Sequence, residues 1–305
     1  MELRHLRYFV TLAEELHFAR AAERLGIAPP TLTVQIQEIE RTLATRLFAR
    51  TKRSVALTAA GAIFLDEARA VLARFAQAES VGRRAGRGEV GRIEIGYVGS
   101  AAYASVLQAQ IRQYRAAWPG VEVNAHELAM AGLPASVGDG SIDIGFIRLP
   151  LPLPAGVSRH VLLRDEFCVA LPAEHPLAST RGRIRAAQLA GEAFIPPEQT
   201  AGTYEIGRRG HFSPRIMDAP GNLIAVLAQV SLGAGVSILP SVVASVVRMP
   251  NLVFRPIAGE QIVSEVAAIF RTHDPSPAVR QFVRQLLQAE AIEMHFGSSD
   301  DATTD

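Results

Sequence analysis

Cationic side chains that can bind phosphate gather in one short stretch near the amino terminus. Residues 41–53 include five basic residues and no acidic one. Such side chains neutralise backbone phosphates and supply most of the non-specific affinity of proteins for nucleic acid. The apolar segments 47–48 and 55–57 predict two short strands joined by a basic tip, a wing, although a solvated surface loop is the alternative. The basic residues of this wing are Arg50, Lys52 and Arg53.

Two predicted helices before the wing would position residues 41–53 for contact with a DNA duplex. Residues 18–25 predict a short helix that ends at Gly26, where a left-handed cap suits glycine. Two prolines then suit the first turn of a second helix, in which apolar residues recur every three or four positions from 32 to 43. Its opposite face is free to enter a major groove, although such a pair is also ordinary core architecture. The predicted DNA-binding residues of the two helices are Arg20, Pro30, Thr31, Thr33, Val34 and Gln37.

Five motifs follow one another in this part of the chain: Leu6-Arg7-Tyr8-Phe9, Ala21-Ala22-Glu23-Arg24-Leu25, Gln35-Ile36-Gln37-Glu38-Ile39-Glu40, Leu47-Phe48-Ala49-Arg50 and Leu57-Thr58-Ala59-Ala60-Gly61. Together they resemble the LysR-type transcriptional regulators. The most similar branch is that of the muconate-responsive regulators of benzoate and catechol breakdown. The resemblance implies an α/β protein with a winged helix-turn-helix, a long linker helix for dimerisation and a two-lobed effector domain. It also implies a homotetramer on bent promoter DNA, contact with RNA polymerase and a role in aromatic compound catabolism.

Two positions of the second helix depart from the family pattern. The family usually has Gln where this chain has Pro29, and often Arg where it has Val34. Neither replacement can donate a hydrogen bond to a base edge, so other residues must read the sequence. Thr33 matches the family's serine position, and Val34 is suited to contact with a thymine methyl group.

The composition indicates a folded, multidomain protein. The chain has 305 residues, 49% hydrophobic and 20% charged, and its single cysteine, Cys168, excludes an internal disulfide. Residues 1–90 carry 14 Arg and Lys against 10 Asp and Glu, or +4, so the remainder must carry −3 to give the overall +1. No apolar stretch reaches the ~18 residues of a membrane span. We therefore expect a soluble, cytoplasmic protein without a membrane partner.

Three segments are predicted along the chain. Residues 1–58 would form the DNA-binding domain, 59–90 a linker helix with a glycine-rich hinge, and 91–305 the effector-binding domain. The linker helix carries an apolar stripe with heptad-like spacing, which predicts a coiled-coil dimer; the alternative is that the stripe packs on its own domain. Pairing would place two helix-turn-helix units on one approximately symmetric DNA site. The stripe consists of Leu65, Ala68, Leu72 and Phe75.

The last 215 or so residues predict two α/β lobes. Strands alternate with helices at a spacing typical of parallel sheets. Lobe I would cover about 91–164 and 267–297, and lobe II about 165–266, with a tail of disordered polar residues from 298. The predicted strands are 92–98, 121–123, 142–147, 167–171, 193–195, 236–240 and 262–270, and the helices are 101–117, 133–137, 187–189, 223–231 and 276–295.

Ligands of open α/β sheets bind beyond the carboxyl ends of strands. Ser100 follows the first strand and Arg148 the third, where a hydroxyl and a guanidinium suit a carboxylate. The resemblance implies effector contacts at both positions, while Met130 replaces a hydroxyl residue and suggests a more apolar acid, such as an aromatic one. Thr203 and Tyr204 are weaker candidates after the flexible segment 199–202. Helix capping by Ser100 and a surface salt bridge of Arg148 are the alternatives.

No pattern in the chain predicts an enzyme. It has no phosphate-binding loop, no G-x-S-x-G elbow and no H-E-x-x-H, and its histidines are scattered. We therefore expect no catalytic residues, metal or cofactor. The predicted partners are promoter DNA, a small organic-acid effector, a second dimer of the same chain and RNA polymerase. The competing function is a small-molecule-binding protein whose N-terminal helices serve only oligomerisation. The operator, the effector and the direction of regulation are left open.

Overall fold

The computed structural model describes residues 1–50 and 54–296, which divide into two compact units. The first unit is Met1–Arg84 and the second is Ala85–Asp305. Lys52 and Arg53, and the predicted tail from 298, lie outside the described residues. Most of the predicted linker segment 59–90 belongs to the first unit, and the described helices include none long and apolar enough to cross a bilayer.

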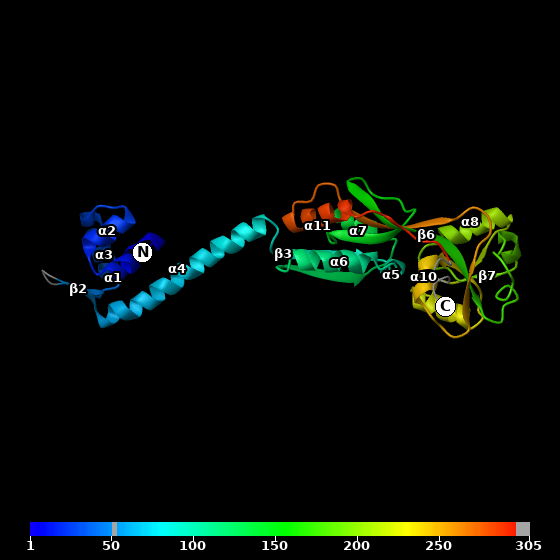
Figure 1. Cartoon of the computed structure of the whole chain (residues 1–305), viewed down its shortest axis with the longest axis horizontal. Helices are drawn as coiled ribbons and strands as arrows, with labels where there is room; N and C mark the ends of the chain where they lie inside the picture. Colours follow the sequence, from blue (N-terminus) through cyan, green and yellow to red (C-terminus); the bar gives the residue numbers. More distant parts are fainter. Residues whose placement is uncertain (51–53, 297–305) are drawn as a thin grey trace, which may run out of the picture. The chain divides into compact units, whose positions relative to one another are not determined.

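The first unit begins with a winged domain of three helices, which precedes the long helix α4 (Figure 1). Gly26 adopts the predicted left-handed conformation, with φ +67°, and ends α2. The stripe Leu32, Ile36 and Ile39 of α3 is buried against α1 and α2, around the packed rings of Phe9 and Phe48. The predicted helix-turn-helix and wing strands are confirmed. The elements are α1 (Leu3–Glu15), α2 (Phe18–Leu25), α3 (Pro29–Thr42), and the antiparallel strands β1 (Phe48–Arg50) and β2 (Val55–Leu57).

The linker helix α4 (Ala59–Gly86) begins against the wing. The Thr58 hydroxyl caps it by accepting the amide of Gly61 at 2.9 Å. Gly61 lies directly against the Leu47 carbonyl, so that a Cβ there would collide with the backbone. The cap and the close approach fix where the helix leaves the domain.

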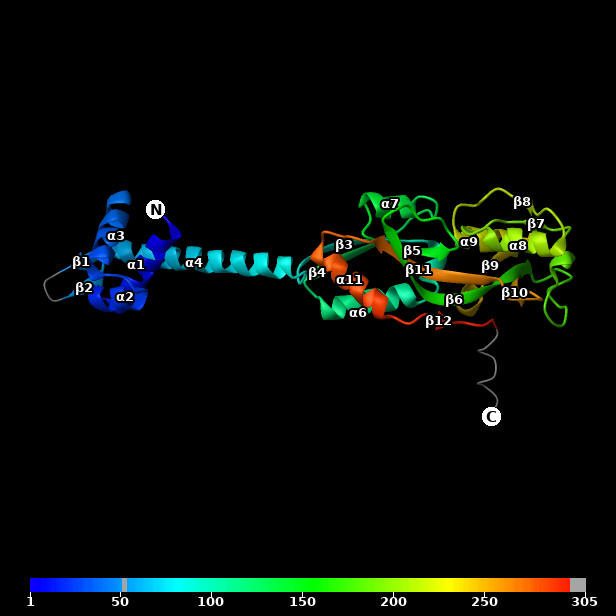
Figure 2. The ribbon, with the colours of Figure 1, turned by 90° about the horizontal axis from the view of Figure 1, so that it is seen from above.

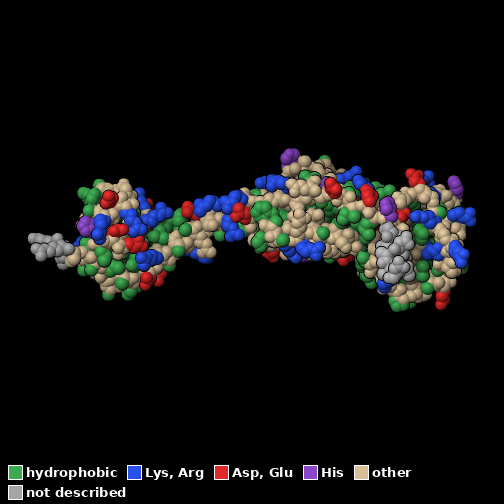
Figure 3. Space-filling model, viewed as in Figure 1, with side chains coloured by type: hydrophobic (Ala, Val, Ile, Leu, Met, Phe, Trp, Pro, Cys, Tyr) green, Lys and Arg blue, Asp and Glu red, His purple; other side chains and the backbone are tan. Residues whose placement is uncertain are grey.

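The predicted coiled-coil stripe packs differently from the expectation. Ala68 is buried in the core of the first unit, and Leu65 and Leu72 pack against it, so the alternative packing on the chain's own domain is confirmed for these three. The apolar side chains that α4 leaves to solvent lie on another face and include Ile63, which is 71% exposed. The last turn carries Arg83 and Arg84, among the basic side chains gathered there in Figure 3.

The second unit is built on a mixed sheet with the order β10-β6-β11-β5-β3-β4. The predicted parallel pairing holds for β3 with β4 and with β5, whereas β11 runs antiparallel to both β5 and β6. The strands are β3 (Gly91–Tyr97), β4 (Val121–Glu127), β5 (Ile144–Leu149), β6 (Val157–Pro172), β7 (Ala193–Phe194), β8 (Arg215–Ile216), β9 (Ser237–Pro240), β10 (Leu252–Pro256), β11 (Val263–Arg271) and β12 (Ile292–Glu293).

Two strands cross from lobe I to lobe II (Figure 2). The first part of β6 pairs with β11, and its last part pairs with β9 and β10. The prediction of a separate strand at 167–171 was therefore too short, because the chain does not break at the lobe boundary. Cys168 lies on this strand and is fully buried, and burial raises the pKa of its thiol well above the ordinary value.

Two predicted helices and one segment predicted to be flexible need correction in the second unit. The expected helix over 101–117 breaks where Ser105 has a left-handed φ of +61°. The segment expected to be flexible, 199–202, leads directly into α8, and the closing helix ends at Gln288 before a short strand. The helices are α5 (Gly99–Ala102), α6 (Val106–Ala117), α7 (Leu133–Asp139), the short 3-10 helix η1 (Ala186–Leu189), α8 (Ala201–Gly210), α9 (Leu223–Ser231), α10 (Ser241–Val246) and α11 (Pro277–Gln288).

Candidate functional site

The free face of α3 is open to solvent in the first unit. Pro30, Thr31, Val34 and Gln37 are exposed, because the buried stripe of the helix occupies the opposite side. Thr33 is half-buried, and its hydroxyl donates to the Pro29 carbonyl at 3.1 Å. Its oxygen can therefore act toward DNA only as an acceptor while that bond persists.

The predicted arginines near this face have acidic partners. Arg20 donates to the Glu15 carbonyl at 2.8 Å, and its Nε lies 3.6 Å from the carboxylate of the same residue. Arg50 pairs with Glu40 at 2.9 Å, and its guanidinium lies 5.0 Å from the centroid of the Phe18 ring. Acidic residues of the same domain therefore hold both of these predicted DNA-binding arginines.

Glu40 ties the wing to the recognition helix. Its Oε1 accepts the backbone amides of Leu47 and Phe48 at 2.9 and 3.0 Å, while its Oε2 holds Arg50. Arg50 therefore helps to position β1 against α3. Among the described residues, Arg46 is exposed and has no ion-pair partner, which makes it a cation available to phosphate.

A cavity of about 870 Å³ lies between the two lobes of the second unit, beyond the carboxyl ends of β3 and β4. This is the place where ligands of open α/β sheets bind. Met130, one of the predicted effector-binding residues, lines it, and so does Gly99, the neighbour of Ser100. The lining residues are Tyr97, Gly99, Ala102, Tyr103, Glu127, Leu128, Ala129, Met130 and Ala131 from lobe I, and Glu198, Gly221, Asn222, Leu223 and Ile224 from lobe II.

The hydrogen-bond donors at Ser100 already hold a carboxylate. The Ser100 hydroxyl donates to Glu198 Oε2 at 3.0 Å, and its amide donates to the same oxygen at 3.2 Å. The amide of Gly99 donates to Oε1 at 3.0 Å. The carboxylate-binding chemistry predicted for Ser100 is therefore present, but its occupant is a side chain of the opposite lobe.

Arg148 does not reach the cavity. It is fully buried in β5, where Nη1 lies 2.6 Å from Asp165 and donates to Ser264 at 2.9 Å. Its Nη2 donates to the Ser100 carbonyl at 3.3 Å. Burial lowers the pKa of the Arg148 guanidinium, and the Asp165 carboxylate opposes that shift. The geometry contradicts the predicted direct effector contact of Arg148, because these groups surround the side chain. The alternative, a surface salt bridge, is also wrong, because the pair with Asp165 is buried.

A buried polar network extends from this ion pair across the lobe junction. The Ser264 hydroxyl lies 3.3 Å from Gln199 Oε1, and Gln199 Nε2 donates to the Leu149 carbonyl at 2.6 Å. Asp165 accepts the amide of Val242 on the lobe II side at 3.3 Å. The network joins β5, β6 and β11 where the chain crosses between the lobes.

The other predicted effector residues do not line the cavity. Thr203 is fully buried in α8, and Tyr204 is 59% exposed and lies outside the lining. The sequence reasoning missed Glu127, whose position at the carboxyl end of β4 was a usable signal. It also missed Glu198, for which no local signal exists because its role depends on lobe II folding back onto lobe I.

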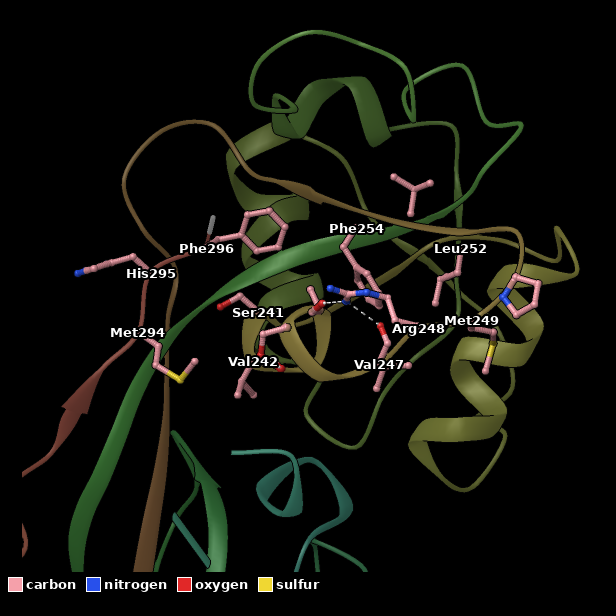
Figure 4. Close-up of a pocket in the computed structure, with 14 residues that line it drawn as sticks. Ser241, Val242, Val247, Arg248, Met249, Leu252, Phe254, Met294, His295 and Phe296 are labelled. Carbon is pink, nitrogen blue, oxygen red and sulfur yellow. Dashed lines mark hydrogen bonds between the residues drawn. The ribbon is translucent and has the colours of Figure 1, made fainter. Parts of the chain in front are cut away.

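A second cavity, of about 720 Å³, lies in lobe II beside α10 and β10 (Figure 4). Phe254, Met294 and Phe296 contribute apolar side chains to its wall. Arg248 also lines it, and its Nη1 donates to the carbonyls of Ala244 and Val247. No residue predicted from the sequence lies in this cavity. Within the described residues, no group of three His, Cys, Asp or Glu side chains could hold a metal ion.

Two family models match the chain. Residues 3–62 match the bacterial regulatory helix-turn-helix protein model of the lysR family, and residues 86–291 match the LysR substrate binding domain. The transcriptional regulator YnfL of Escherichia coli is 37% identical over 95% of this chain and 99% of its own, and AlsR of Bacillus subtilis is 34% identical over 93% and 94%. The full-length CbnR structure in complex with its target DNA has a TM-score of 0.78 and 28% identity, covering 95% of this chain and 99% of CbnR.

Proposed function

Because this chain belongs to the LysR family, it is a DNA-binding transcriptional regulator, and we propose that α3 reads promoter DNA through its exposed face. The single observation that carries this assignment is the solvent-exposed row of Thr31, Val34 and Gln37 on a helix whose other side is packed. An amide such as that of Gln37 can form two hydrogen bonds with adenine, and Val34 suits a thymine methyl group.

Phosphate contacts supply the sequence-independent part of the affinity. We assign them to Arg46, which is exposed, and to Lys52 and Arg53 of the wing sequence. Arg20 and Arg50 belong to the same domain and also contribute to phosphate binding. Their contribution is smaller because Glu15 and Glu40 already pair with them. Each phosphate neutralised adds about one unit to the salt dependence of binding.

The test compares variants on an operator duplex and on a scrambled duplex of the same length. The operator is obtained by selecting from fragments upstream of the neighbouring genes. Gln37→Ala and Val34→Ala should weaken operator binding by about 5- to 150-fold, since one base contact contributes roughly 1–3 kcal/mol, and should leave scrambled binding nearly unchanged. Thr33→Ala should also weaken binding to the operator more than binding to the scrambled duplex, because it removes a hydroxyl oxygen that can accept a hydrogen bond from a base.

Phosphate variants should behave differently in the same titrations. Arg46→Ala and Arg53→Ala should weaken binding to both duplexes alike. They should also lower by about one the slope of the logarithm of the affinity against the logarithm of the salt concentration. Gln261→Ala, at an exposed position of the second unit outside the lining of the cavity between the lobes, is the control and should leave binding to both duplexes unchanged. Equal losses on both duplexes for Gln37→Ala would contradict base reading by α3.

We assign self-association to α4 and to the second unit. The apolar side chains that α4 leaves exposed, Ile63, Val71 and Val81, would be covered by a partner. A dimer presents two recognition helices to one approximately symmetric site, and the family resemblance extends this to a dimer of dimers that contacts RNA polymerase. The competing function, a ligand-binding protein whose N-terminal helices only oligomerise, predicts no site-preferring, salt-sensitive complex with DNA.

We assign control of the promoter to a small molecule in the cavity between the lobes. Binding that favours one lobe arrangement would shift the spacing of paired DNA-binding units in the oligomer. The resemblance to the muconate-responsive branch predicts an aromatic or dicarboxylic acid catabolite. The aromatic part of this prediction is supported by Tyr97, Tyr103 and Met130 in the lining. The acidic part is not supported by the contacts at Ser100, because its amide and hydroxyl already donate hydrogen bonds to Glu198.

A further inference from the structure

The charge of the cavity wall opposes the expected acidic effector. Glu127 and Glu198 line the cavity, and its described lining contains no Arg, Lys or His. Their Oε1 atoms lie 2.7 and 2.8 Å from the position that a Cβ on Gly99 would occupy, so the two carboxylates converge on one point of the wall. A carboxylate ligand placed there would meet two like charges.

The two acids have unused hydrogen-bond capacity. Glu198 accepts three hydrogen bonds, from Gly99 and Ser100, whereas the described residues provide no hydrogen bond to the Glu127 carboxylate. An ionised carboxylate has about four acceptor positions. The wall therefore presents acceptors and lacks matching donors around Glu127.

The buried Arg148 offsets the charge of Glu198 only in part, because Glu198 is the last of the acidic groups that act on its guanidinium, after Asp165. The Nη atoms of Arg148 are directed to Asp165, Ser264 and the Ser100 carbonyl, so its charge is already paired inside the protein. An acidic effector would have to displace Glu198 from three donors and leave it unpaired beside Glu127. A ligand with N–H donors instead adds hydrogen bonds without breaking any.

The rest of the lining suits an apolar or aromatic body. Tyr103 and Leu128 from lobe I, and Leu223 and Ile224 from lobe II, surround the acids. Burial, Glu127 and Glu198 raise the pKa of Tyr103, so its phenol keeps its proton and remains a donor. A compact aromatic molecule with a nitrogen-containing polar end matches this combination.

We infer that the effector is an N–H-donating molecule with a cationic or neutral polar end, such as an amidine, amine or amide, and is not a carboxylic acid. Glu127 accepts its N–H groups, and Glu198 joins it from lobe II while remaining bound to Ser100. This inference rests on the proposed function of the cavity as the effector site. It replaces the organic-acid effector expected from the sequence.

The test uses three probes that share one ring and differ in charge: benzamidine, benzamide and benzoate. Binding to the full chain is measured by calorimetry and by the rise in melting temperature, since a ligand specific to the folded form stabilises it. Benzamidine should bind more tightly than benzamide, and benzoate should give no shift. Glu127→Gln should lower the affinity for benzamidine at least tenfold, because it removes the negative charge of the side chain while preserving its shape.

Glu122→Gln is the matched control. It removes an exposed glutamate from the same strand, β4, outside the cavity lining, and should leave benzamidine binding unchanged. Binding of benzoate to the wild-type cavity would overturn the inference. So would the absence of binding by all three probes, or benzamidine binding that is unaffected by Glu127→Gln.

DNA binding tests the proposed function separately from the effector class. The same protein samples are titrated with operator and scrambled duplexes in the absence of probe. Loss of all DNA binding would refute the regulator assignment of the first unit, whatever the probes do. Intact DNA binding together with benzoate binding would refute only the inferred effector class.

Discussion

Replacement of Arg148 distinguishes a structural ion pair from a ligand contact. The side chain is fully buried, and Arg148→Ala would leave Asp165 buried without its cation. Removing one partner of a buried pair costs about 3–5 kcal/mol, because the remaining charge is uncompensated. For a domain of this size, 1 kcal/mol corresponds to roughly 2–4 °C, so the melting temperature of the second unit should fall by about 6–20 °C.

The single tryptophan allows this unit to be followed within the full chain. Trp118 follows α6 and packs against the core of the second unit, so its fluorescence reports the unfolding of that unit alone. Arg208→Ala is the control: its side chain is 73% exposed and pairs with Glu205, and such surface pairs contribute about 0–1 kcal/mol. Arg148→Met combined with Asp165→Leu should recover part of the stability, because no unpaired charge remains.

The refuting result has two parts. If the free energy of unfolding of Arg148→Ala were within about 1 kcal/mol of the wild-type value, the buried-pair argument would be wrong. If that stable variant had also lost binding of a cavity probe, Arg148 would be a ligand-contacting residue, as the sequence suggested.

Three further predictions concern packing, pH and assembly. Gly61→Ala should destabilise the first unit by about 1–3 kcal/mol because its Cβ meets the Leu47 carbonyl, whereas Gly82→Ala, with open space around it, should stabilise α4 by up to about 1 kcal/mol; circular dichroism melts of both variants check this. Hydrogen bonds from neighbouring arginines lower the pKa of Glu205 to about 2 from its ordinary 4.5, so its stabilising contribution is complete above the ordinary value and is lost as the pH falls toward 2. The stability difference between wild type and Glu205→Gln should therefore shrink over that range in denaturant titrations, and a constant difference would contradict the shift. Ile63→Glu should lower the oligomeric state in light scattering without altering the melting temperature of the first unit, since the residue is exposed in the monomer.

The local parts of the fold could be predicted from the sequence. The stop at Gly26, the start of α3 at the prolines and the buried stripe from Leu32 to Ile39 depend on neighbouring residues, and all three are confirmed. The face used by α4 was misassigned because apolar periodicity shows that a stripe is buried but does not identify what covers it. Ala68 packs on its own domain, whereas Ile63 remains exposed.

The candidate effector site could be located but its chemistry could not. The rule that ligands bind beyond strand ends led to the edge of the sheet where the cavity between the lobes lies, with Met130 in its lining and Ser100 bound to the lining residue Glu198. Glu198 is 98 residues from Ser100 in sequence, and only the folding of lobe II brings them together. Arg148 was misjudged for the same reason, because its partner Asp165 lies on the crossing strand β6.

The central claim is that the first unit holds a specific duplex through charge and through the face of α3. The most direct measurement is the affinity of the wild-type chain for its operator and for a scrambled duplex, each over a range of salt concentrations. We predict operator binding at least a thousandfold tighter at physiological salt, with the logarithm of the affinity falling linearly as the logarithm of salt concentration rises. Equal affinity for both duplexes, or no binding at low ionic strength, would contradict the claim.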